Sequence, residues 1–350
     1  MEQFVCVRMI QANGIDLSWF QFDYDQTWAA FFMNADKTVY GRYGTRTDQR
    51  EATREMSLEG LRKALAAALE IHKGYPGNKD ALVGKQGKKP RFATPEQYPN
   101  LRKYKSTIAT EGRIVPSCIH CHSVRDEENL AYRNALQPIP KDDLFAYPLP
   151  DVAGMKLDPL ERAKVKEVLP GSAAAKAGFK TSDEIVTLEK QPIVSIADVQ
   201  WVLHHATVPG TLSAEVLRDG KRTMVALSLE PGWRDKMDIS WRATTWDFRR
   251  MVTGGIYMEE ATDEERAKAK LGKNSLALRA QHVGEYGEHA AAKKAGVKPD
   301  DIIVEWDGLS QRMSESEIIA RTLQKRPKGE KIPIAVVRGE QRLKFEIPMQ

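Results

Sequence analysis

Hydrophobic and polar positions change their period along this chain, and the period predicts where strands and helices lie. Residues 4–10 form an apolar run that predicts a buried strand. Two further apolar runs, residues 28–33 and 38–44, flank the polar turn at 34–37 and predict a hairpin. Helical spacing begins after Ser57, a residue type that caps helix N-termini, so a helix is expected there. Its apolar positions are Leu58, Leu61, Leu65, Leu69 and Ile71.

The second half of the chain contains the same pattern twice. Residues 173–186 and 291–304 share a run of small residues ending in Ala-Gly, a short polar turn with an aspartate and a β-branched strand. Residues 216–220 correspond in the same way to residues 336–340. Such self-similarity predicts two copies of one folding unit. Each copy is expected to contain a glycine-capped helical turn, a strand, an amphipathic helix and a closing hairpin.

Each copy resembles a PDZ domain of the bacterial kind that is attached to HtrA-like proteases. The resemblance rests on Pro-Gly-Ser-Ala-Ala at 170–174 followed by Ala-Gly at 177–178, and it covers about 151–230 and 250–350. It implies a small, partly open β-barrel that takes a peptide as an extra strand on a sheet edge. Backbone N–H groups beside that edge would hold the terminal carboxylate of the peptide.

The resemblance also implies where a peptide would bind. The loops at 152–155 and 253–256 match the carboxylate loop of the family, in which a glycine lets the carboxylate approach the backbone. The histidines of the first amphipathic helix would border the groove. An alternative is that the PDZ fold serves only to pack domains together. The peptide-binding residues predicted in this way are Gly154, Met155, His205, Gly255 and Ile256.

The N-terminal order of strand, hairpin and helix resembles the later part of a thioredoxin fold, over residues 4–75. In that family a strand, a helix and a Cys-x-x-Cys turn come earlier, and a cis-proline precedes the hairpin where this chain has residues 25–27 as Asp-Gln-Thr. The chain is similar to a bacterial group that joins a thioredoxin-like domain to PDZ domains, some of whose members are selenoproteins. The resemblance leads to the hypothesis that a selenocysteine codon read as a stop makes this sequence begin late.

Residues 118–122 read Cys-Ile-His-Cys-His and contain the attachment motif of c-type haem. Cys118 and Cys121 would form thioethers to the haem, and His122 would be the proximal ligand of the iron. The second axial ligand would be Met155, His72, another residue or water, and the motif does not choose among them.

Three other interpretations of the cysteine motif stay open. The two thiols could form a redox pair, because a neighbouring imidazolium favours the thiolate that carries out disulfide exchange. His120 could join them and His122 in a zinc or copper site. The third alternative is a structural disulfide.

Composition and missing motifs narrow the function. The 350 residues carry a net charge of +5, spread along the chain, which bears on solubility more than on partners. No apolar run has the length of a membrane span. Tryptophans and arginines alternate over residues 232–252, where packing is a better explanation than nucleic-acid binding because no nucleic-acid module accompanies them.

The chain has no Gly-x-Ser-x-Gly or Gly-Asn-Ser-Gly-Gly turn, no P-loop and no dinucleotide fingerprint. On these grounds we predict a binding protein in preference to an enzyme, and not a serine protease. The enzyme alternative is a thiol–disulfide oxidoreductase in which Cys118 attacks, Cys121 resolves and the PDZ domains present substrates.

The sequence as a whole predicts a multidomain α+β protein that binds peptides or protein C-termini. Its compartment is expected to be the periplasm or another extracytoplasmic space, because covalent haem is attached and disulfides persist outside the bacterial cytoplasm. The predicted segments are a partial thioredoxin-like domain at 1–75, a linker with the cysteine motif at 76–150, a first PDZ domain at 151–231, an aromatic-rich linker at 232–249 and a second PDZ domain at 250–350.

Overall fold

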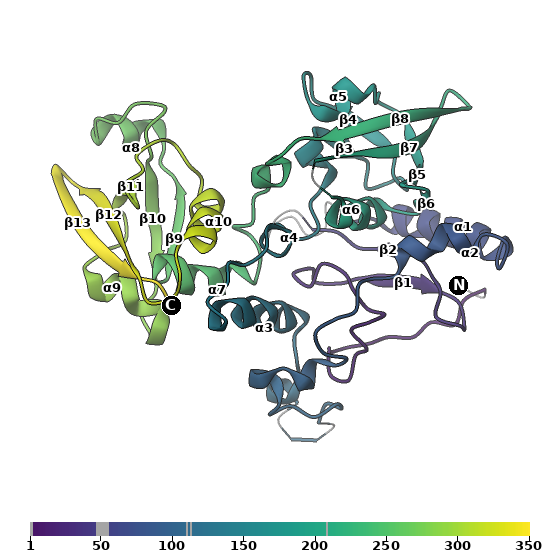
Figure 1. Cartoon of the computed structure of the whole chain (residues 1–350), viewed down its shortest axis with the longest axis horizontal. Coiled ribbons are helices and arrows are strands. Elements are labelled where there is room, and N and C mark those ends of the chain that lie inside the picture. Colours follow the sequence, from purple (N-terminus) through teal and green to yellow (C-terminus); the bar gives the residue numbers. More distant parts are fainter. Residues whose placement is uncertain (1–2, 47–55, 110, 113, 208) are drawn as a thin grey trace. The chain divides into compact units, whose positions relative to one another are not determined.

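The computed structural model describes residues 3–46, 56–109, 111–112, 114–207 and 209–350 (Figure 1). The chain divides into two compact units. The first unit comprises Met1–Glu127 and Phe145–Met237, and the second comprises Glu128–Leu144 and Asp238–Gln350. Within the ranges just given, the structure contains no helix with the length and apolarity needed to cross a membrane.

The predicted N-terminal hairpin and helix are confirmed. Strand β1 (Ala30–Met33) pairs antiparallel with β2 (Val39–Tyr43). Helix α1 (Leu58–Lys73) begins after Ser57, whose side-chain oxygen accepts a hydrogen bond of 2.8 Å from the Gly60 N–H. The helix packs its alanine-rich face on β2, and this cluster forms a small core.

The prediction of a buried strand at 4–10 is wrong. These residues form no strand, and the side chain of Val5 is 96% exposed. An apolar run becomes a buried strand only where a neighbouring strand accepts its backbone hydrogen bonds, and β1 and β2 pair only with each other in the described residues. The thioredoxin-like segment is therefore not shown. Residues 47–55, which belong to the segment predicted at 1–75, lie outside the described residues.

Residues 76–150, the segment predicted as a linker with the cysteine motif, contain several short helices and buried apolar side chains. Tyr98 and Leu101 are buried in a small core together with Ile15 and Ile119. The reason is that short helical turns bring isolated apolar side chains together without any long periodic run. The elements are α2 (Lys79–Leu82), η1 (Val83–Lys85), η2 (Pro95–Gln97), η3 (Pro99–Leu101), η4 (Val115–Ser117), α3 (Cys121–Asn134), α4 (Lys141–Leu144) and η5 (Pro150–Ala153).

The first repeat is built from a two-stranded and a four-stranded sheet. Strand β3 (Met155–Leu157) pairs antiparallel with β4 (Val165–Val168). The larger sheet has the order β6-β5-β7-β8, and the apolar side of α6 contributes to the core beneath it. The remaining elements are α5 (Ala173–Ala177), β5 (Glu184–Leu188), β6 (Gln191–Pro192), α6 (Ile196–His205), β7 (Gly210–Arg218), β8 (Lys221–Leu229) and η6 (Trp233–Lys236).

The second repeat forms one five-stranded antiparallel sheet in the order β13-β12-β11-β10-β9, with α10 beside β9 (Figure 1). Its elements are α7 (Thr245–Phe248), η7 (Arg249–Thr253), β9 (Ile256–Glu260), α8 (Asp263–Lys268), β10 (Leu278–Val283), η8 (Gly287–Ala290), α9 (Ala291–Ala295), β11 (Ile302–Trp306), α10 (Glu315–Lys325), β12 (Lys331–Arg338) and β13 (Gln341–Pro348).

The internal repeat is confirmed down to single ion pairs. In the first repeat, Arg218 lies 2.7 Å from the buried carboxylate of Asp183. In the second repeat, Arg338 lies 2.6 Å from the buried carboxylate of Asp301. Each aspartate also accepts a backbone N–H three residues earlier, so the turn before the strand is held in the same way in both copies.

Candidate peptide-binding site

The carboxylate loop predicted for the first repeat leads directly into β3. Gly154 ends η5 with a φ of +81°, a left-handed conformation that glycine adopts without strain. A Cβ at this position would lie 2.1 Å from the Cβ of Ser172. Close packing against Ser172 and the backbone conformation are each a reason for glycine here, and the part of Gly154 in binding a carboxylate stays a prediction.

Strand β3 has one edge that pairs with no strand in the described residues. The Gly154 carbonyl accepts the Leu169 N–H at 2.9 Å, and the Asp158 N–H donates to the Lys164 carbonyl at 2.8 Å. Both bonds lie on the β4 side. Because backbone groups alternate in direction along a strand, the N–H and C=O groups of Met155 and Leu157 point to the opposite edge.

The side chains of β3 alternate between the core and the surface. Met155 is 2% exposed and belongs to the same apolar core as Val199 and Leu203 of α6. In this structure Met155 is thus a core residue, and its predicted roles as a haem ligand and as a peptide-binding residue stay predictions. Lys156, between the two inward residues, is exposed, as expected for a strand with one buried face.

The C-terminal half of α6 holds the chain that enters the carboxylate loop. Gln200 donates its side-chain N–H to the Tyr147 carbonyl at 3.0 Å, and the Tyr147 N–H donates to Nδ1 of His204 at 3.4 Å. The predicted groove residue His205 instead lies on the indole of Trp201, with 4.1 Å between ring centroids. Its part in peptide binding stays a prediction.

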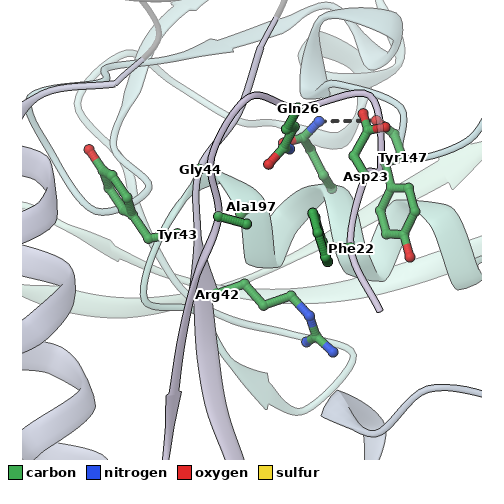
Figure 2. Close-up of a pocket in the computed structure, with 10 residues that line it drawn as sticks. Phe22, Asp23, Gln26, Arg42, Tyr43, Gly44, Tyr147 and Ala197 are labelled. Carbon is green, nitrogen blue, oxygen red and sulfur yellow. Dashed lines mark hydrogen bonds between the residues drawn. The ribbon is translucent and has the colours of Figure 1, made fainter. Parts of the chain in front are cut away.

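The N-terminal elements cover another face of α6. Arg42 of β2 stacks on Trp201 with 3.5 Å from the guanidinium to the ring centroid, and the Trp201 indole N–H donates to the Gly84 carbonyl. A cavity lies on this face, where Phe22 and Gly44 approach Ala197 (Figure 2). A peptide beside α6 would therefore lie on its β3 side.

Burial makes the α6 histidines sensitive to acid. Burial is the largest cause that lowers the pKa of His204 well below its ordinary value of 6.5, with a smaller contribution from the neighbouring His205. Burial also lowers the pKa of His205. Below pH 6.5 the unfolded chain therefore binds protons at these histidines that the folded chain does not bind. The free energy of unfolding is unaffected by them above that pH and decreases as the pH falls below it.

We expect a smaller loss of stability on acidification in the variant His204→Asn, whose side-chain oxygen still accepts the Tyr147 N–H. Urea unfolding of the first unit at pH 7.5, 6 and 5 would measure this. An unchanged pH dependence in the variant would contradict the assignment to His204.

The corresponding loop of the second repeat is also closely packed. Gly255 has a φ of +91°, and a Cβ there would lie 2.0 Å from the His289 carbonyl oxygen. Ile256 is fully buried and begins β9. As in the first repeat, the glycine packs closely against a neighbouring segment and the hydrophobic residue after it is buried in the core.

The cysteine motif lies where η4 ends and α3 begins. Cys118 is buried, and its Sγ donates to the Ile114 carbonyl at 3.3 Å. Cys121 is the first residue of α3, and burial raises the pKa of its thiol, which opposes thiolate formation. His122 contacts Asp126 through Nδ1 at 3.2 Å, and this hydrogen bond raises the pKa of the imidazole.

These geometries bear on each interpretation of the motif. All three cysteines are free thiols, so the structure contains no disulfide at Cys118 and Cys121. Across the described ranges, no three His, Cys, Asp or Glu side chains gather as a metal site. Cys118 is buried and Cys121 is half-buried, whereas a covalent haem needs both sulfur atoms on one open face. Haem at Cys118, Cys121 and His122 stays a prediction from the motif.

Comparison with known proteins supports the PDZ assignment. A model of the PDZ domain family matches residues 126–229. The periplasmic serine endoprotease DegP of Escherichia coli strain K12 is 40% identical over 86 residues, which are 25% of this chain and 18% of that protein. A probable DegP-like periplasmic serine endoprotease of Pseudomonas fluorescens is 25% identical over 203 residues, which are 58% of this chain and 39% of that protein. The solved serine endoprotease of Yersinia pestis matches at 26% identity with a TM-score of 0.20, covering 22% of this chain and 27% of that one.

The prediction that excluded a serine protease is wrong. The relatives are themselves serine endoproteases, and this chain spans 18% and 39% of the length of the two curated ones. A nucleophile turn that is missing from such a stretch does not exclude proteolysis. Residues 126–229 contain a PDZ domain, and part of the chain is homologous to the DegP-like periplasmic proteases.

Proposed function

We propose that the first repeat binds the free C-termini of peptides or unfolded proteins in an extracytoplasmic compartment. The proposal rests on the outer edge of β3, which follows the left-handed Gly154 loop and has β4 as its one strand neighbour among the described residues. A peptide added there would receive backbone hydrogen bonds at Met155 and Leu157. The periplasmic relatives support the compartment.

Amide hydrogen exchange tests this proposal at single residues. The probe is a set of ten-residue peptides with a free carboxyl end and a terminal Val, Leu or Phe, each paired with its C-terminal amide. We expect the free-acid peptides to slow exchange at Met155 and Leu157, whose N–H groups face outward. The Lys156 N–H points toward β4, so its exchange is expected to stay unchanged.

The variant Leu157→Pro removes one outward N–H on an edge strand, a position where proline is tolerated. Because Leu157 is also buried in the core, its effect is compared with that of Leu157→Ala, which shortens the side chain but keeps the N–H. Loss of one backbone hydrogen bond is expected to weaken peptide binding about three- to tenfold, as measured by fluorescence anisotropy. The control Lys156→Ala changes an exposed side chain of the same strand and should bind as the natural chain does. Peptide binding without slower exchange in β3, or equal binding of acid and amide peptides, would refute the proposal.

A further inference from the structure

The second repeat differs from the first at the position where a peptide would pair. Strand β9 is the last strand of its sheet, with β10 on one side. On its other side the Met258 N–H donates to Oε1 of Glu315 at 2.8 Å. Glu315 is the first residue of α10, the helix beside β9. A side chain of the protein thus already accepts a hydrogen bond that β9 would offer to a visiting backbone.

Arg249 holds this carboxylate in place. Its Nε lies 3.0 Å from Oε1 and its Nη2 lies 2.6 Å from Oε2 of Glu315, a bidentate arrangement. The side chains of Arg249 and Glu315 are only 1% and 3% exposed. The guanidinium also lies 4.6 Å from the Trp246 ring centroid and 4.4 Å from that of Tyr257, and it donates to the Ser240 carbonyl. The pair is therefore rigid and shielded from water.

The first repeat has no such arrangement at the same place. Both helices begin after a serine N-cap, and the residue that follows is Ile196 in α6 but Glu315 in α10. In the part of the first repeat that the structure describes, the Leu157 N–H, which faces outward on β3, has no carboxylate partner on α6. The two copies of one fold therefore present different edges.

We propose that the second repeat is a self-closed PDZ groove, in which Glu315, locked by Arg249, takes the place of a peptide backbone on β9. The inference rests on the proposed function, because it assigns peptide capture to the first repeat and closure to the second. A free peptide entering the second groove must break a buried, bidentate ion pair, whereas on β3 the outward Leu157 N–H has no such carboxylate partner on α6 in the described residues. Binding at β9 is therefore at least tenfold weaker than at β3.

The exchange experiment with the same peptide set measures both strands in one sample. In the natural chain we expect slower exchange at Met155 and Leu157 but not at the amides of β9. The double variant Arg249→Met, Glu315→Ile replaces the ion pair by apolar side chains, a substitution that proteins often tolerate at buried ion pairs. Isoleucine is also the residue at the matching position of α6, Ile196. In this variant, the peptide should also slow exchange in β9. The control Lys331→Met, Glu346→Ile removes an exposed ion pair of the same repeat and should leave β9 unresponsive.

The closing contact is also measured without any peptide. Glu315→Gln keeps an acceptor oxygen but removes its charge, so exchange at Met258 should become several-fold faster. Unchanged exchange at Met258 would overturn the inference even if the double variant failed to fold. Slower β9 exchange in the natural chain at the peptide concentration that affects β3 would overturn it as well, as would a folded double variant that gains no response. If the peptides bound at neither strand, the proposed function would be refuted. Exchange of the Met258 N–H in Glu315→Gln would still test whether Glu315 closes β9.

Discussion

Asp198→Ala is expected to lower the free energy of unfolding of the first unit by about 3–5 kcal/mol, the cost of breaking a buried ion pair. The Asp198 carboxylate lies 2.8 Å from Nζ of Lys85, and each side chain is 1% exposed. It also accepts the backbone N–H groups of Val194 and Arg42. Burial lowers the pKa of Lys85 while Asp198 opposes that shift, so alanine would leave a buried ammonium and two buried N–H groups unpaired.

Urea unfolding followed through exchange of the α6 amides measures this loss. Glu167→Ala is the matched control, because its ion pair with Lys156 is 51% exposed on both sides and should contribute at most about 1 kcal/mol. The double variant Lys85→Met, Asp198→Leu should recover much of the stability, since it removes both charges together. Equal effects of the Asp198 and Glu167 variants would contradict the importance of the buried pair.

Gly255→Ala is expected to destabilise the second unit by about 3 kcal/mol or more. The left-handed conformation, with φ of +91°, costs an alanine about 1–2 kcal/mol. The added Cβ would also lie 2.0 Å from the carbonyl oxygen of His289, so the backbone of that segment must move. Thermal or urea unfolding of the second unit gives the value.

Gly339→Ala separates the two causes within the same unit. Gly339 has a φ of +61°, and nothing lies within 4 Å of its added Cβ. Alanine there meets only the conformational penalty, which is about 1–2 kcal/mol. If both variants lost a similar free energy of unfolding, the His289 carbonyl would have moved away from the new Cβ at no cost in stability. Glycine would then be required at 255 only for its backbone conformation.

Local chemistry made much of the second half of the chain predictable. The glycines that end α5 and α9 adopt the left-handed conformation, with φ of +89° and +110°, as the small-residue turns implied. The polar turns and closing hairpins follow in both copies. In the N-terminal part, the hairpin and the capped α1 could be predicted for the same reason, because every required residue lies within a few positions of its partner.

Predictions that depended on distant partners were less successful. Residues 4–10 have the composition of a strand, but a strand forms only where another strand supplies hydrogen bonds. The glycine in each carboxylate loop was predictable, whereas the residues that pack against it, Ser172 and His289, were not. The Arg249–Glu315 ion pair could not be predicted from the sequence, because an arginine in an aromatic stretch and a glutamate at a helix start both have ordinary local roles.

The sequence alone determined that one PDZ-type unit occurs twice, because caps, turns and β-branched runs act through neighbours in the chain. It also determined the five-residue cysteine motif. Only the tertiary structure decided which sheet edge is open, since that depends on what lies beside β3 and β9 in space. A single difference after the helix caps, Ile196 in one copy and Glu315 in the other, acquires its meaning when folding brings the Met258 N–H and Arg249 to the same carboxylate.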